Sequence, residues 1–273
     1  MGEFMQTPLV KKQLAKRGLT EAQGRKLLTE QLKADGATGH QFRTMTKQQQ
    51  RKAWNSGLAE SSLIEKLLTA SPETTEKAVR SVVGATARLG CGKGKNISDY
   101  VDLEGLARTK RTMFERAARY VPTEMLKTMK SGGVKAVYDD SSKRPYFTNE
   151  NRTIHLVQGS DKFNVVHEMM HAVEACDSSF LESEKEYFDE RVKGWGFATL
   201  QELTGNSLYE PDELAFDLGD ESVHPYLFKS YPNSTNYELM SFGVELLYRM
   251  PSAYERDIDM VKWILKMLGG YRS

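Results

Sequence analysis

The feature that most constrains this chain is an apolar run in its middle, residues 163–173, that contains three ionisable side chains. Its apolar residues fall on nearly every side of a helix, so we expect a buried helix here; they are Phe163, Val165, Val166, Met169, Met170 and Val173. Two histidines and a glutamate in such a helix, His167, Glu168 and His171, are costly unless they find partners. Something inside the fold must therefore satisfy these three side chains.

The spacing of the three polar residues indicates a metal ion. Residues four apart lie one above the other on a helix, so His167 and His171 can present two imidazoles to one ion. Glu168 lies one step round the helix, where it reaches a water molecule on the metal rather than the metal itself. This His-Glu-x-x-His pattern is typical of zinc metallopeptidases, with two ligands and a general base. The alternative is a pair of hydrogen-bonded core histidines with Glu168 at the surface, but one zinc ion accounts for all three residues.

A catalytic zinc needs a third protein ligand and one open position. Glu174 lies on the same helix, one turn beyond the second histidine, so it suits a role behind the ligands rather than on the ion. We expect the third ligand to be Glu238, on a helix that begins near residue 235. Glu238, Ser241 and Glu245 fall at i, i+3 and i+7 and form one polar stripe on this apolar helix. Ser241 or Glu245 would then orient a histidine ring.

Asp177 is the alternative third ligand. In the related pattern His-Glu-x-x-His-x-x-Gly-x-x-His, the last ligand falls at the position of Asp177, and aspartate can replace histidine there. The glycine that lets the chain turn back is Glu174 in this sequence, so we expect the helix to continue. The choice lies between Glu238 and Asp177, with Glu238 preferred.

The segments around the motif predict an α+β fold that is mostly helical. We expect helices at about 102–120 and 122–132, then strands at 134–138 and 152–157 with a turn near 149–151. The motif helix should begin near Asp161. Helices, strands and then the motif helix is the order of a zincin-like catalytic domain, in which a small sheet lies over the active-site helix.

The first part of the chain, residues 5–95, predicts a region of short helices without a recognisable functional motif. Thr20–Gln23 has the form of a capping box at a helix start. Residues 1–4 resemble a cloning scar. The glycine-rich stretch at 90–95 is expected to be a connector, which makes 96–273 the catalytic domain.

Charge is divided unevenly along the chain. Residues 1–144 hold 27 Lys and Arg against 15 Asp and Glu, a balance of +12, whereas residues 145–273 hold 11 against 22, a balance of −11. A basic first half is typical of proteins that bind nucleic acid or an acidic partner. No nucleic-acid motif accompanies the charge, so the alternative is that the two halves attract each other and leave Lys and Arg on solvated helix faces.

Composition also bears on the compartment. The two cysteines, Cys91 and Cys176, are too few for a disulfide framework or a cysteine-built zinc site, which favours a reducing compartment. No apolar run approaches the ~20 residues of a membrane span, and no signal-peptide pattern opens the chain. We therefore expect a cytoplasmic protein that does not enter a membrane.

Aromatic residues are frequent shortly before Glu238. Zinc peptidases commonly supply a tyrosine or histidine from such a segment to hold the oxyanion of the tetrahedral intermediate. Tyr231 and His224 are therefore expected to be catalytic, together with Glu168. Packing by amphipathic aromatic side chains, Tyr226 among them, is the alternative.

With these residues, the chain resembles the gluzincin branch of the zinc metallopeptidases, in which a later glutamate completes a His-Glu-x-x-His site. More narrowly, residues 120–270 resemble zincin-like domains encoded by phages and prophages, through the segments 151–156, 224–231 and 237–245. The resemblance implies Zn²⁺ as cofactor and a protein or peptide substrate. It also implies a phage or host protein as partner, and a protein that is cytoplasmic, virion-associated or injected.

The primary hypothesis is a zinc endopeptidase in which His167, His171 and Glu238 hold the ion and Glu168 is the general base. Two alternatives keep the same fold. A virion-associated or scaffold protein would retain the site without turnover, and a prophage-encoded effector or toxin protease would cleave a single host target. Glu168 argues against the inert form, because a purely structural zinc site needs no base.

Overall fold

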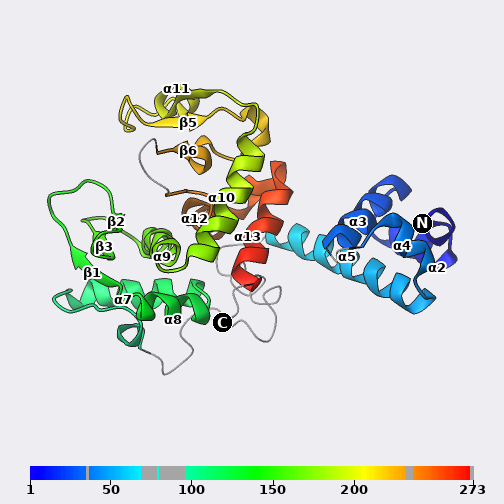
Figure 1. Cartoon of the computed structure of the whole chain (residues 1–273), viewed down its shortest axis with the longest axis horizontal. Helices are drawn as coiled ribbons and strands as arrows, with labels where there is room; N and C mark the ends of the chain where they lie inside the picture. The colour runs from blue at the N-terminus through cyan, green and yellow to red at the C-terminus, as the bar shows by residue number, and fades with distance from the viewer. Residues whose placement is uncertain (35–36, 69–78, 80–95, 232–235, 271–273) are drawn as a thin grey trace. The chain divides into compact units, whose positions relative to one another are not determined.

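The computed structural model describes residues 1–34, 37–68, 79, 96–231 and 236–270 (Figure 1). The chain divides into two compact units, Met1–Lys66 and Leu67–Ser273. The connector predicted at 90–95 lies outside the described residues.

The described residues of the first unit form helices joined by short turns, and no strand is present among them. Its helices are α1 (Gly2–Met5), α2 (Pro8–Lys16), α3 (Glu21–Ala34), α4 (Gly39–Thr44) and α5 (Lys47–Leu68), the last of which continues two residues past the end of the unit. The capping box at the start of α3 is confirmed, because Thr20 N–H donates to Gln23 Oε1 (2.8 Å) and Gln23 N–H donates to Thr20 Oγ1 (3.2 Å). The helices enclose an apolar core around Trp54, whose indole N–H donates to Gln13 (2.6 Å).

The second unit combines helices with two small sheets (Figure 1). Its helices are α7 (Arg108–Ala117), α8 (Thr123–Ser131), α9 (Lys162–Cys176), α10 (Ser178–Val192), α11 (Leu200–Thr204), α12 (Ser241–Arg249) and α13 (Ile258–Gly270). Its strands are β1 (Lys135–Tyr138), β2 (Tyr146–Thr148), β3 (Thr153–Leu156), β4 (Phe197–Thr199), β5 (Leu214–Phe216) and β6 (Lys229–Ser230). The fold is therefore α+β and mostly helical, as the sequence predicts.

The first sheet has the order β1–β3–β2, with β1 parallel and β2 antiparallel to β3. β1 and β3 lie where the sequence predicts strands. β2 is an addition, since residues 146–148 pair with 153–155 where the sequence indicates only an approach to a turn. The ring of Tyr146 stacks on that of His155 at 4.2 Å between centroids, a cross-strand contact that stabilises this short edge strand.

Helix α9 lies at the centre of the second unit. Asp161 caps it by accepting from the N–H groups of Phe163 (2.8 Å) and Asn164 (3.0 Å), so the helix begins where it is predicted to. It continues through Glu174 to Cys176, which confirms that the chain does not turn back there. Helices α7, α8, α10 and α12 and strands β2 and β3 all contact α9, and they bury its apolar residues on every side.

Two predicted helix starts are wrong. The helix expected from about residue 102 begins at Arg108, because Asp102 pairs with Lys135 beside the first sheet. The helix expected from about residue 235 is α12, which begins at Ser241, so Glu238 lies in the turn before it. In this turn the N–H of Met240 donates to the carboxylate of Glu184 (2.8 Å). The hydrogen-bond partner of this N–H therefore comes from another helix, α10.

The second sheet is antiparallel, in the order β4–β5–β6. Its last strand, β6, leads directly into Tyr231. Among the described residues, no helix has both the length and the apolar character that a membrane crossing requires.

Candidate metal centre

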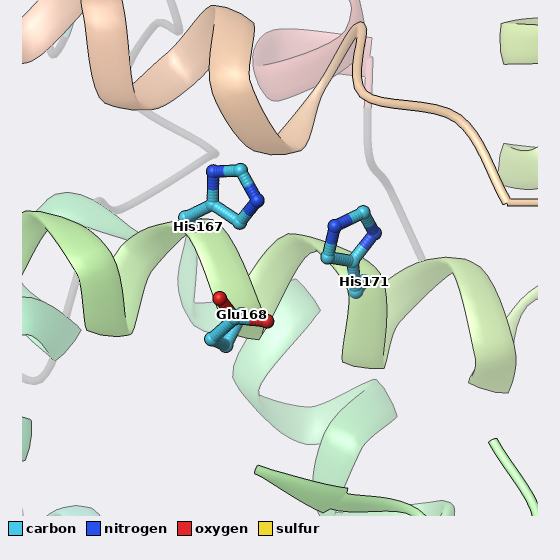
Figure 2. A group of neighbouring side chains, drawn as sticks. All are labelled: His167, Glu168 and His171. Atoms are coloured by element: carbon cyan, nitrogen blue, oxygen red, sulfur yellow. The ribbon is translucent and has the colours of Figure 1, made fainter. Parts of the chain in front are cut away.

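His167, Glu168 and His171 form a group of three potential metal ligands in the described part of the chain. One ligand atom from each lies within 4.8 Å of the other two. Figure 2 shows both imidazoles rising from the same side of α9, with Glu168 on an adjacent side. His167 and Glu168 are only 9% and 4% exposed, so the surface position of Glu168 required by the core-histidine alternative is not observed.

Glu238 joins this group from the turn before α12. Its Oε2 lies 3.1 Å from His167 Nε2 and 3.4 Å from His171 Nε2. Ligand atoms bound to one tetrahedral zinc at ~2.0–2.1 Å are about 3.3 Å apart. Both distances match that separation, so Glu238 Oε2 lies at the distance from each histidine nitrogen that a shared zinc ion would require.

Carboxylates outside this group hold both histidine rings. Glu245 Oε2 lies 2.9 Å from His167 Nδ1, and Glu174 Oε2 lies 3.0 Å from His171 Nδ1. A carboxylate on Nδ1 fixes the proton there and leaves Nε2 as the ligand atom, which is the usual arrangement around metal-binding histidines. Of the two orienting residues expected from the sequence, Glu245 contacts a histidine.

The other expected orienting residue, Ser241, contacts Glu238 and not a histidine. Its hydroxyl donates to Glu238 Oε2 (2.9 Å), and the Tyr231 hydroxyl donates to Glu238 Oε1. Hydroxyl groups therefore fix the orientation of the Glu238 carboxylate.

The electrostatics favour positive charge between the ring nitrogens. Burial opposes protonation of His167, but the carboxylates of Glu168, Glu238 and Glu245 outweigh it and raise its pKa to about 10. Burial likewise opposes protonation of His171, whose pKa the neighbouring carboxylates raise well above its ordinary value. A cation bound here would take over the charge that protons otherwise supply.

Glu238 and Glu168 respond differently to this environment. Burial acts to raise the pKa of Glu238, but His171 and His167 overcome it and lower the pKa well below its ordinary value. For Glu168, burial prevails over the attraction of the two histidines, and its pKa is raised. A raised carboxyl pKa is what a general base needs if it is both to accept and to release a proton near neutral pH.

A cavity of 390 Å³ opens beside the three ligands and Glu168. Residues 145–147, on and just before the edge strand β2, form one wall, and Lys229 and Tyr231 form part of another. A second hollow of 310 Å³ shares His167 and Glu168 with the first, so these residues lie where the two meet. The candidate centre is thus accessible, as a catalytic site must be.

Other residues predicted for the site lie elsewhere. The Nδ1 of His224 accepts from Tyr226 N–H (3.1 Å), its ring packs 5.1 Å from that of Phe242, and it lines neither hollow. Asp177 caps α10 by accepting from the N–H of Ser179 (2.9 Å), whereas Glu238 Oε2 faces the Nε2 atoms of both histidines. Tyr231, by contrast, lines the 390 Å³ cavity.

Two residues at the centre have no role in the sequence-based prediction. Tyr226 lines both hollows, but only its place in an aromatic segment marks it in the sequence. Glu184 contacts the site from α10, a helix rich in exposed charges, and no local pattern distinguishes it from its neighbours.

Comparison of the chain with protein-family models, curated proteins and solved structures found no match. The function therefore has to be inferred from the geometry of the site. Its ligand set, its buried glutamate and its adjoining cavity are the features that bear on it.

Proposed function

We propose that this chain is a zinc-dependent endopeptidase with a zincin-like catalytic domain. One observation carries the proposal: Glu238 Oε2 lies 3.1 and 3.4 Å from the Nε2 atoms of His167 and His171. Three protein ligands leave one position open, which is the arrangement of catalytic rather than structural zinc.

When bound, zinc would supply a Lewis acid that polarises the scissile carbonyl and a water molecule. Glu168 would act as the general base that takes a proton from water and delivers it to the leaving amine. Two observations support this role: Glu168 borders the cavity, and its pKa is raised. Tyr231 would keep Glu238 in position, because its hydroxyl donates to Glu238 Oε1.

The shape of the cavity supports an extended peptide as substrate. Residues 145–147 line it, and β2 is the edge strand of the first sheet. An edge strand offers backbone N–H and C=O groups to which an extended chain can pair. A peptide held there would pass the Glu168 carboxylate.

The experiment is a comparison of wild type with Glu168→Gln, both loaded with zinc and incubated with a proteome-derived peptide library. The variant should retain zinc and lose roughly 100- to 10,000-fold in cleavage rate, because the amide cannot accept a proton. Asp177→Asn is the matched control, since it keeps an N-cap on α10 and should cleave as wild type does. A Glu168→Gln variant that still cleaves would remove Glu168 from this role, and a zinc-loaded wild type that cleaves nothing would favour a scaffold protein.

A further inference from the structure

Glu184, in α10, is an ionisable residue with no role in the proposed peptide hydrolysis. It is 0% exposed, although glutamate is among the residues least often buried. Its Oε1 accepts the hydrogen bond from Met240 N–H (2.8 Å), in the turn that carries Glu238. Its Oε2 is buried and receives no N–H or O–H from another residue in the described part of the chain.

The other carboxylate oxygen in the same condition belongs to Glu174. Glu174 Oε1 is likewise buried and receives no N–H or O–H from the described residues, and the carboxyl groups of Glu174 and Glu184 lie against each other. Two ionised carboxylates cannot share such a contact in a buried site, since their charges repel and neither has a proton to donate. One of the two groups therefore carries a proton.

Glu184 is the group that holds this proton. Burial and the nearby Glu174 raise its pKa well above its ordinary value. Glu174 is needed as an acceptor, because its other oxygen lies 3.0 Å from His171 Nδ1. The neutral Glu184 then donates through one oxygen and accepts through the other.

We propose that Glu184 is a positioning residue for the metal centre, which couples the orientation of His171 to the position of Glu238. Glu184 contacts Glu174, whose other oxygen is hydrogen-bonded to the ring of His171. Glu184 also accepts from Met240 N–H, in the turn that carries Glu238. These two ligands come from separate elements, so a fixed bridge between their supports sets the spacing that one ion requires. The inference rests on the proposed function, because it assumes that the ligands bind zinc.

Glutamine provides a matched test of this bridge. A Glu184→Gln side chain can accept from Met240 N–H through its oxygen and donate to Glu174 through its amide, as a protonated glutamate does. Leucine has a similar volume and can do neither. Aspartate is one methylene shorter, so Glu184→Asp cannot reach both partners at once.

The measurement is zinc affinity of the full chain by competition with a chromophoric chelator, together with the visible spectrum of the Co²⁺-substituted protein. We expect Glu184→Gln to bind zinc within about threefold of wild type and Glu184→Leu to lose roughly 10- to 100-fold, with an altered Co²⁺ spectrum. If Glu184→Leu does not fold, Glu184→Asp should show the same loss.

Any of the following results would contradict the positioning role of Glu184. Equal affinity in wild type and in the folded Leu or Asp variant would show that the bridge does not position the ligands. A loss in Glu184→Gln as large as in those variants would show that Glu184 is not a neutral donor. A folded wild type that binds no zinc would instead remove the proposed function, and the inference with it.

Discussion

The two histidines of the candidate centre are supported in physically different ways. We define the His167 side as His167, Glu245, Arg249 and Asp161. Along it, basic and acidic side chains alternate, each in contact with the next. Glu245 Oε1 accepts from Arg249 Nε (2.8 Å), and the Arg249 guanidinium also binds both carboxylate oxygens of Asp161 at 2.8 Å. The side chain of Arg249 is 35% exposed, so this chain of charges reaches solvent.

On the His171 side, which consists of His171, Glu174 and Glu184, both carboxyl groups are buried, at 4% and 0% exposure. No arginine or lysine is among the described partners of either carboxyl group, and their contact depends on one proton. The same task, holding an imidazole by its Nδ1, is thus done by a solvated ion pair on one side and a buried shared proton on the other.

The difference predicts unequal sensitivity to substitution. Ion pairs near the surface are screened and their partners are replaced by water when one is lost, so they contribute little individually. A buried carboxylate without a cation interacts with its histidine at a lower effective dielectric constant, so its loss costs more. The His171 side should therefore be the more fragile of the two.

The largest effect should follow from removing the ligand that both sides share. Glu238→Ala deletes the one carboxylate that faces both Nε2 atoms, so zinc affinity should fall by more than the roughly 100-fold upper limit for residues behind the ligands. Chelator competition measures it. Asp177→Asn, at the alternative third-ligand position, should bind zinc as wild type does; a loss there with full binding in Glu238→Ala would reverse the assignment.

Glu174→Gln and Glu245→Gln test the two sides of the centre separately. Each replaces a carboxylate on Nδ1 by a neutral amide, and each should weaken zinc binding by roughly 10- to 100-fold. Glu174→Gln should lie at the upper end, because no cation compensates on that side, and Glu245→Gln at the lower end, because Arg249 remains. Isothermal titration with zinc and a competing chelator measures both, and equal losses would mean that the two supports are equivalent.

The smallest effect should be a pH-dependent one at the outer end of the His167 side. Burial acts to raise the pKa of Asp161, but the hydrogen bonds from Arg249 and from the first turn of α9 prevail and lower it below its ordinary value of 3.8. A lowered folded-state pKa means that the stabilisation is present above about pH 4 and is lost as pH falls through the folded-state value.

Asp161→Asn keeps the helix cap but loses the ion pair, so it should be less stable than wild type at pH 7 by less than about 1 kcal/mol. At pH 3 the difference should shrink, because protonation begins to remove the same ion pair from wild type. Urea unfolding midpoints at the two pH values measure this. A gap between the two proteins that grows on acidification would show that Asp161 is not stabilised as an anion.

Local sequence patterns predicted the parts of this centre that are local. The i, i+4 spacing of His167 and His171 requires only that the segment be helical, and the cap at Asp161 lies directly before it. The i, i+7 relation of Glu238 and Glu245 correctly selected two residues that contact the histidines, although the helix begins only after Glu238.

The rest depended on contacts between distant segments. Glu184 meets Met240 across 56 residues of sequence, and no pattern in α10 indicates which of its glutamates faces inward. His224 and Tyr226 are two residues apart in one aromatic segment, yet only Tyr226 lines the hollows, because the ring of His224 packs against Phe242. The three-residue strand β2 is likewise defined by its pairing with β3 rather than by its own residues.

The most direct test of the account is the zinc content of the purified, folded chain after equilibration with zinc and removal of loosely held metal, measured by native mass spectrometry. The account predicts one zinc ion per wild-type chain and none in the double variant His167→Gln, His171→Gln. A folded wild-type chain without zinc, or a double variant that retains it, would contradict the central claim.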